Sequence, residues 1–184
     1  MKKRCEWAKD EPNTTYHDDE WGVPLHDDVG LFEFLILEGA QAGLSWRTIL
    51  NRRDGYRIAF SNFDVVAVSK YTQNYVKKLL QNKDIIRNKL KINSAINNAK
   101  QFVKIQQEFG SFDEYLWGFV NHKPIKNKFK KHSDLACSSI ISEKLSQDLK
   151  KHGFTFVGPI ICYSLMQAVG MVNDHTSDCY KYLK

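Results

Sequence analysis

The sequence predicts an all-α protein that folds as a single domain over residues 1–184. Apolar side chains recur at three- and four-residue intervals through most of the chain, whereas the strict alternation typical of β-strands is scarce. The composition, 42% hydrophobic and 26% charged residues, is sufficient for a packed core. The 184 residues are enough for one domain and marginal for two, and no internal repeat or low-complexity linker divides them.

Four helices are expected in the N-terminal half of the chain. A run of large apolar residues from Leu31 to Leu37 is long enough for a buried helix. Ser45, Asp64 and Thr72 each precede a helical pattern, and these residue types accept hydrogen bonds at a helix N-cap. The four expected helices comprise residues 29–40, 45–53, 63–70 and 72–82.

Three further helices are expected in the C-terminal half. Between the first two of them, residues 121–134 are polar and basic, and we interpret them as a variable surface loop rather than a phosphate-binding surface. The first expected helix is residues 88–110, with Ile92, Ile96, Ala99 and Val103 on one face and Gly110 as the C-terminal stop. The second is residues 138–153, with Ile141, Leu145 and Leu149 on one face and Gly153 at the end. The third is residues 158–170, with Pro159 at its start.

The net charge of +6 favours an anionic partner, most commonly nucleic acid, although solvated surface lysines explain the charge equally well. No apolar run approaches the ~20 residues that a membrane-spanning helix needs, and the basic start lacks the apolar stretch of a signal peptide. We therefore expect a soluble cytoplasmic protein with no membrane partner. Four cysteines do not indicate a disulfide framework here, and Cys162, within an apolar helix, is expected in the core.

Cysteine and histidine residues lie near both ends of the chain. Cys5 and His17 are close to the start, whereas His175 and Cys179 are four residues apart near the end and share one helical face or one turn. Two cysteines and two histidines form the ligand set of a closed, structural zinc site, which would hold the two ends together. Ordinary buried side chains fit the spacing about equally well. A catalytic zinc is also not excluded, because the adjacent sequence HDDE supplies carboxylates.

A second candidate site surrounds Glu38, which follows the apolar run and needs a partner for its charge. Trp46 comes after a tight turn, and Tyr16, Trp21 and Trp7 belong to the aromatic N-terminal segment. Aromatic faces attract a flat cation, and a carboxylate accepts hydrogen bonds from an amino group. An alkylated purine in DNA has both features. The simpler alternative is a core that contains one paired glutamate.

Residues 79–92 place a short turn between two helical patterns, with Arg87, Lys89 and Lys91 at the start of the second. Backbone amides at a helix N-terminus, together with these cations, suit a DNA phosphate. The segment lacks the Gly-rich hairpin of a typical helix-hairpin-helix motif. Leu44, at the tip of the turn AGLSW, is a candidate wedge for the space that a flipped base vacates; the alternative is an ordinary core leucine.

Four segments closely resemble the TAG family of DNA-3-methyladenine glycosylases, and the similarity extends from Cys5 to Cys179. The resemblance implies an all-α fold of the helix-hairpin-helix glycosylase superfamily. It implies excision of 3-methyladenine from double-stranded alkylated DNA, with the free base as product, as the first step of base-excision repair in bacteria. The segments are CEWAKDEPNTTYHDDEWGVP, LEGAQAGLSWRTIL, LWGFVNHKP and KKHGFTFVGPIICYSLMQAVGMVNDH.

The resemblance also assigns roles to particular residues. It implies a base pocket around Glu38, with Tyr16 and Trp46 among its walls, and we expect Glu38 to be the catalytic side chain of a monofunctional, monomeric enzyme. It implies one structural Zn²⁺ per chain, whose ligands are Cys5, His17, His175 and Cys179.

Two regions depart from the resemblance. Residues 82–89 lack the glycines of the superfamily hairpin, and no candidate for the superfamily's catalytic aspartate follows them. Residues 125–139 differ from the family pattern and are expected to vary. A non-enzymatic, helical nucleic-acid-binding module with a zinc clip is the rival hypothesis, but it leaves Glu38 and its aromatic neighbours without a role.

Overall fold

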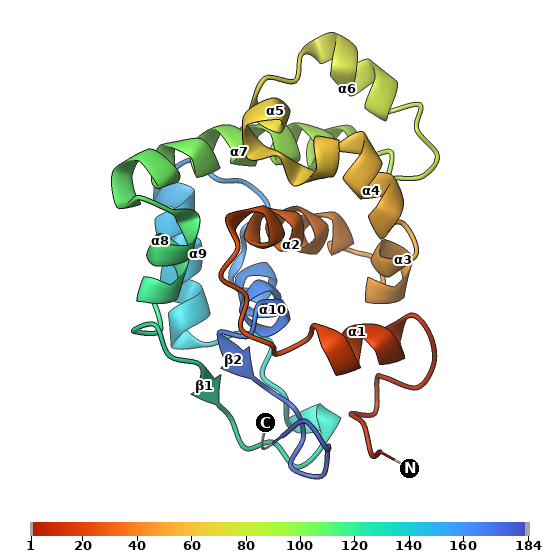
Figure 1. Ribbon diagram of the computed structural model, residues 1–184, viewed down its shortest axis with the longest axis vertical. Coiled ribbons are helices and arrows are strands. Elements are labelled where there is room, and N and C mark those ends of the chain that lie inside the picture. The colour runs from red at the N-terminus through yellow and green to blue at the C-terminus, as the bar shows by residue number, and fades with distance from the viewer. Residues whose placement is uncertain (1, 183–184) are drawn as a thin grey trace.

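A computed structural model describes residues 2–182, and helices dominate this part of the chain (Figure 1). No helix within it combines the length and the hydropathy needed to cross a membrane. The elements in chain order are α1 Asn13–Asp19, α2 Asp28–Gln41, α3 Trp46–Leu50, α4 Arg53–Ala59, η1 Ser61–Phe63, α5 Val65–Ser69, α6 Gln73–Leu79, α7 Lys89–Phe109, α8 Phe112–Gly118, β1 Ile125–Lys126, η2 His132–Asp134, α9 Ile140–Lys151, α10 Pro159–Ala168 and β2 Val172–Asn173.

Helix α2 lies at the centre of the fold, between α7 and α10 (Figure 1). Residues 31–40 are all buried, because α2 contacts α3, α7, α8 and α10. At its start, the Asp27 carboxylate accepts a hydrogen bond from the Gly30 N–H at 2.8 Å, which defines the N-cap. Because α2 is central, Glu38 near its end lies in the interior of the protein.

The two ends of the described chain lie on the same side of the molecule (Figure 1). Strands β1 and β2 pair in parallel there, with Ile125 opposite Val172. The backbone N–H of Tyr180 donates to the Lys3 carbonyl at 2.9 Å. Backbone hydrogen bonds therefore bring together segments separated by almost the whole sequence.

Most sequence-based helix boundaries are confirmed, and one predicted cap is wrong. The side chains of Ser45 and Asp64 accept the expected N-cap hydrogen bonds. Thr72 occupies the N-cap position of α6, but its side chain accepts no such bond, so only the backbone defines that start. Gly110 ends α7 with φ +91°, as a C-terminal glycine should. Helices α1, α4 and α8, of seven residues each, were not expected from the sequence.

The core is a single hydrophobic cluster that includes residues from both chain ends. On α7, the buried face includes Phe102 and Ile105 beside the expected positions, whereas Val103 is half-buried. Cys162 is buried in α10, as its apolar surroundings predict, and Cys137 is exposed. The candidate metal ligands Cys5 and Cys179 and the candidate pocket residues Tyr16 and Trp21 therefore belong to one continuous core.

Candidate active site and metal centre

A cavity of about 340 Å³ lies where the N-terminal segment, α1, the end of α2, the start of α3 and α10 meet. All residues that the sequence assigned to a base pocket line this one space. The lining residues are Trp7, Asn13, Tyr16, Trp21, Glu38, Gln41, Ser45, Trp46, Arg47, His132, Leu135, Ser164 and Gln167.

Aromatic rings form the walls of the cavity. The ring centroids of Tyr16 and Trp46 are 5.2 Å apart, with planes inclined by 52°. On the other side, Trp7 meets Trp21 edge to face at 5.0 Å, and Tyr16 and Trp21 are buried. The Trp46 Nε1–H is buried without a hydrogen-bond partner. The walls thus offer apolar ring surfaces and a donor that needs an acceptor.

Glu38 is 4% exposed and forms no hydrogen bond or ion pair with the described residues. Burial alone raises the pKa of its carboxyl from 4.5 to about 8. Burial, followed by the nearby Glu38 charge, holds the pKa of Tyr16 well above its ordinary range, so the phenol keeps its proton and can donate. Glu33, five residues earlier on α2, is instead paired with Arg53 at 2.5 Å and Arg57 at 3.0 Å.

The turn between α2 and α3 holds Trp46 against the cavity. Ser45 caps α3, so Trp46 is fixed as the first helical residue. Arg47 forms an ion pair with Asp10 and thereby ties α3 to the N-terminal segment. Leu44, at the tip of the turn, is 40% exposed, which excludes the alternative of a core leucine.

Several lining residues were missed from the sequence. His132 lies in residues 121–134, which were interpreted as a variable surface loop, and Leu135 lies in residues 125–139, which were expected to vary. Ser164 and Gln167 lie three residues apart on α10, and their isolation in an otherwise apolar helix was a usable signal. The Gln167 Nε2 donates to the buried Asp174 carboxylate at 2.8 Å, which fixes the amide at the cavity wall.

The expected phosphate-binding cations have different surroundings. Arg87 lines a second hollow, of about 530 Å³, together with Arg52 and Lys83. Lys89 is exposed at the start of α7. Lys91 differs from expectation, because its Nζ donates to the carbonyl oxygens at the end of α2 rather than facing an open surface.

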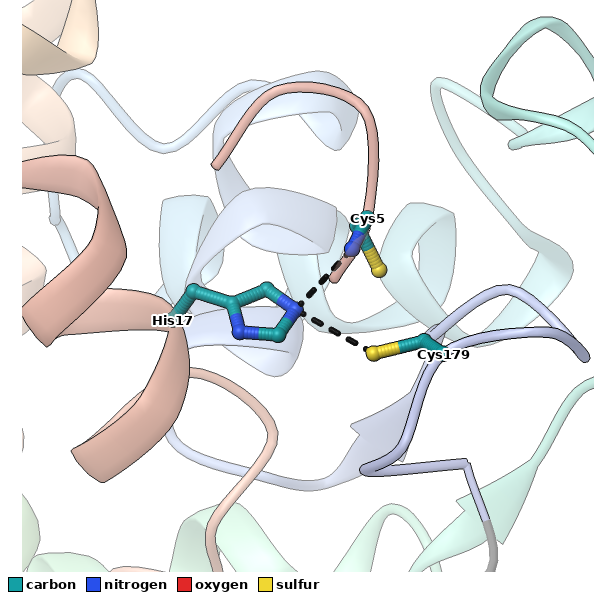
Figure 2. A group of neighbouring side chains, drawn as sticks. All are labelled: Cys5, His17 and Cys179. Carbon is teal, nitrogen blue, oxygen red and sulfur yellow. Dashed lines mark hydrogen bonds between the residues drawn. The ribbon is translucent and has the colours of Figure 1, made fainter. Parts of the chain in front are cut away.

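A separate buried group joins the chain ends (Figure 2). One potential ligand atom each from Cys5, His17 and Cys179 lies within 4.8 Å of the others. The His17 Nε2 is 3.4 Å from the Cys179 Sγ and accepts from the Cys5 N–H at 3.3 Å. Helix α1 supplies the histidine, and the two irregular end segments supply the thiols.

His175 lies beside this group but is not one of the three residues whose ligand atoms lie within 4.8 Å of one another. Its ring centroid is 4.9 Å from that of His17, and its Nδ1 is 3.0 Å from the Asn173 Oδ1. Its Nε2 is buried and has no hydrogen-bond partner. His175 and Cys179 share an irregular, turn-rich segment rather than a helical face. Two thiols and two imidazoles, one of which has a nitrogen atom without a partner, are donors that suit Zn²⁺.

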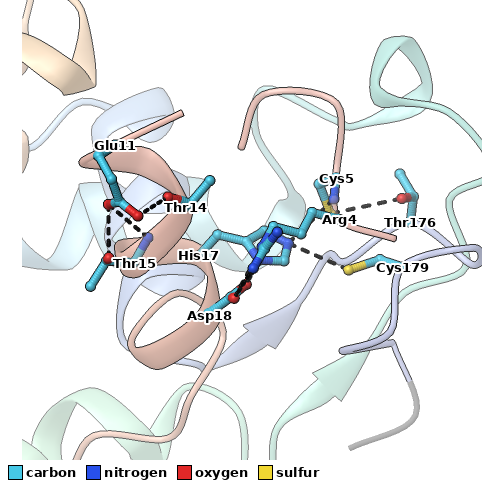
Figure 3. Close-up of polar contacts among 9 residues, drawn as sticks. All are labelled: Arg4, Cys5, Glu11, Thr14, Thr15, His17, Asp18, Thr176 and Cys179. Atoms are coloured by element: carbon cyan, nitrogen blue, oxygen red, sulfur yellow. Dashed lines mark hydrogen bonds and ion pairs between the residues drawn. The ribbon is translucent and has the colours of Figure 1, made fainter. Parts of the chain in front are cut away.

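Polar partners orient the first histidine (Figure 3). The Asp18 Oδ1 is 2.8 Å from the His17 Nδ1, and Arg4 holds the same carboxylate from Nη2 at 2.6 Å. With Nδ1 occupied in this way, Nε2 faces the thiols, which is the usual arrangement for a metal-binding imidazole. Glu20 is paired with Arg53, so two of the nearby carboxylates are bound to arginines and are poorly placed to serve a catalytic metal.

The structure is that of a mostly helical protein with an aromatic-walled cavity beside one unpaired carboxyl group, an arrangement that suits a planar ligand. The family model for methyladenine glycosylases matches residues 7–182, and the chain belongs to this family. The resemblance found in the sequence is thereby confirmed.

Two bacterial relatives match almost the full chain. DNA-3-methyladenine glycosylase 1 of Escherichia coli (strain K12) is 45% identical over 181 residues, covering 98% of this chain and 97% of the relative. DNA-3-methyladenine glycosylase of Haemophilus influenzae (strain ATCC 51907 / DSM 11121 / KW20 / Rd) is 41% identical and covers 97% of both. A solved structure of 3-methyladenine DNA glycosylase I from Staphylococcus aureus, concerned with 3-methyladenine recognition, is 36% identical. The two structures superpose with a TM-score of 0.95, and the match covers 98% of this chain and 97% of the Staphylococcus aureus chain.

Proposed function

We propose that this chain, which has the 3-methyladenine DNA glycosylase activity of its family, performs that reaction in the cavity around Glu38. The observation that carries the proposal is a buried carboxyl group without a protein partner, facing an aromatic cavity. Leaving such a group unsatisfied is costly, so its retention indicates a ligand that supplies the missing hydrogen bonds. The rival hypothesis of a non-enzymatic module leaves this arrangement unexplained.

The reaction begins when the lesion leaves the duplex stack and enters the cavity. Unstacking costs a few kcal/mol and is easier for a damaged base, and stacking on aromatic rings returns about 1–3 kcal/mol. Trp46 and Tyr16 supply such rings. The Trp46 Nε1–H and the Tyr16 hydroxyl are the donors available to ring nitrogens of the bound purine.

The Glu38 carboxylate neutralises the positive charge of the bound base and accepts a hydrogen bond from its amino group. A methylated adenine in DNA is cationic, and a nearby cation favours the ionised form of a carboxyl group. The raised pKa of Glu38 in the free cavity is therefore expected to fall when the lesion enters. Water then attacks C1′ of the sugar, the bond from C1′ to the purine nitrogen breaks, and the bonding electrons neutralise the departing base. Because the leaving group is already activated, a strong general base is not needed.

We infer that residues outside the cavity hold the DNA. Leu44 projects from the turn beside the cavity and would fill the vacated stack. The loop of residues 80–88 joins α6 to α7 as the hairpin of a helix-hairpin-helix unit. Arg87 and Lys89 would meet the phosphates there, and Arg52 and Lys83 make the hollow beside them positive.

We infer one structural Zn²⁺ per chain, held by Cys5, His17, His175 and Cys179. The buried, unpartnered Nε2 of His175 supports the fourth position, next to the three atoms that already lie close together. Since one chain supplies both the cavity and the four ligands, we expect a single-domain monomer. A chromosomal substrate indicates action in the bacterial cytoplasm.

The direct test is single-turnover excision of 3-methyladenine by Glu38→Gln, with abasic sites in methylated duplex DNA as the readout. We expect a loss of at least about a hundredfold, because the variant exchanges an acceptor oxygen for a donor and removes the opposing charge. Glu143→Gln is the matched control, since Glu143 is exposed on α9 and does not line the cavity. Equal rates for both variants would remove Glu38 from the active site.

A further inference from the structure

Lys91 lies half-buried in the first turn of α7, and its ammonium group reaches the end of α2. Its Nζ donates hydrogen bonds to the carbonyl oxygens of Ala40 and Ala42, each at 2.7 Å. Ala40 belongs to the last turn of α2, where the carbonyl groups lack partners within the helix. Lys91 therefore satisfies backbone acceptors that α2 itself leaves free.

The charge of Lys91 also suits its position. A helix C-terminus is stabilised by a nearby cation, and the last turn of α2 contains no basic residue. Helix α7 supplies the cation instead. Lys91 lies 51 residues after Ala40 and 49 residues after Ala42 in the sequence. The contact links the helix that follows the DNA-binding hairpin to the helix that carries Glu38.

The backbone beyond these carbonyls turns sharply. Ala42 has φ −44° and ψ 117°, and Gly43 has φ +76°, a conformation that favours glycine. The Leu44 N–H donates to the Gln41 carbonyl at 2.6 Å. The three carbonyls of residues 40–42 are thus all bound, two of them by one ammonium group.

We propose that Lys91 is a positioning residue for the glycosylase reaction, which fixes the turn of residues 42–45 and with it the Leu44 wedge and the Trp46 wall. The inference rests on the cavity function proposed above, and it replaces the phosphate contact expected for Lys91 from the sequence. Catalytic rates fall steeply when a binding wall is displaced, because the reacting groups lose their alignment.

The test compares Lys91→Met, Lys91→Arg and Lys100→Met by single-turnover excision at saturating duplex DNA. Lys100 is an exposed lysine on the same helix and does not line the cavity. We expect Lys91→Met to be slower by about ten- to a hundredfold. Lys91→Arg should recover part of the rate, since it keeps the charge and the donors, and Lys100→Met should match the parent.

The salt dependence of DNA binding separates positioning from a phosphate contact. A positioning role predicts an unchanged slope for Lys91→Met, whereas a lost phosphate contact lowers the slope by about one. A parent-like rate at saturation, with weaker and less salt-dependent binding, would overturn the inference. So would a lower melting temperature with a parent-like rate per folded molecule.

Two further variants keep the outcome decisive. If Lys91→Met yields no folded protein, Lys91→Gln is measured in the same assays against the same expectations. Glu38→Gln is run beside them, because an active Glu38→Gln enzyme would defeat the proposed cavity function. A slow Glu38→Gln enzyme together with a fast Lys91→Met enzyme would defeat the Lys91 inference only.

Discussion

The base cavity and the candidate metal centre each contain one side-chain nitrogen atom that is fully buried and has no hydrogen-bond partner. Within residues 2–182, the side-chain nitrogen and oxygen atoms that have no exposed surface and no hydrogen bond are the Trp46 Nε1 in the cavity and the His175 Nε2 at the chain ends. Around His175, thiol and imidazole atoms lie close enough to share one ion. Around Trp46, about 340 Å³ of space separates the walls.

The difference separates a site built to keep its ligand from one built to exchange it. Unsatisfied buried groups destabilise a folded protein, so a bound ligand would stabilise each region. At the metal centre, a permanent ligand would add to folding stability. In the cavity the deficit persists until a base enters, which is the usual conflict between stability and activity. Substitutions in the two regions should therefore have opposite effects on stability.

The largest stability effect is expected at the metal centre. Cys179→Ser should lower the zinc content from about one ion per chain and lower the melting temperature by about 10 °C or more. Base binding by the folded fraction should persist, because Cys179 does not line the cavity. Metal analysis and thermal melting check this, with Cys137→Ser, at an exposed thiol, as the control. Parent protein that was never exposed to chelator and contains no metal would remove the zinc site.

In the cavity, the substitution Glu38→Gln should raise the stability of the protein, whereas Cys179→Ser lowers it. The pKa of Glu38 is about 8 in the folded protein against an ordinary 4.5, so the folded state holds the proton more tightly. The resulting stabilisation is complete below about pH 4.5 and is lost as the pH rises to about 8. Glu38→Gln avoids this loss, so its stability relative to the parent should rise by about 1.4 kcal/mol per pH unit in that window. Denaturant unfolding at several pH values measures the difference, and a constant difference would contradict the prediction.

Glu33 should behave in the opposite way from Glu38 on the same helix. Glu33→Gln removes the charge that Arg53 and Arg57 share and leaves part-buried cations uncompensated. We expect the free energy of unfolding to fall by about 3 kcal/mol. Excision per folded molecule should stay near the parent rate, since Glu33 does not line the cavity. Chemical denaturation beside single-turnover excision tests this, and an inactive but stable variant would be the contrary result.

The smallest effect is expected at the exposed hairpin. Lys89→Ala should weaken binding to all DNA sequences alike and reduce the slope of log affinity against log salt concentration by about one. Titration of duplex DNA at several salt concentrations measures the slope. An unchanged affinity at every salt concentration would show that Lys89 does not meet a phosphate.

The sequence predicted the chemistry of both regions better than their geometry. Residue types were sufficient to bring Glu38, Tyr16 and Trp46 under one hypothesis, and the structure places all three on one cavity. His132 was missed because it belongs to a polar, irregular segment with no periodicity, and only the tertiary fold brings that segment to the cavity mouth.

The partners of Lys91 were not predicted from the sequence for a related reason. Local sequence puts it at a helix start, where a cation suggests a phosphate contact. Its actual partners are backbone carbonyls about fifty residues earlier, and no local pattern specifies how α7 packs on α2. The Thr72 cap failed similarly, since the residue type permits a capping hydrogen bond without requiring one.

The most direct measurement is a ¹³C NMR titration of the Glu38 carboxyl group, in the free protein and with 3-methyladenine bound. In the free protein we predict a pKa of about 8, because the carboxyl is buried without a partner. With the base bound we predict a lower pKa, because hydrogen bonds from its amino group favour the ionised form. A pKa near 4.5 in the free protein, or one that does not change when the base binds, would contradict the assignment of Glu38 to the bound base.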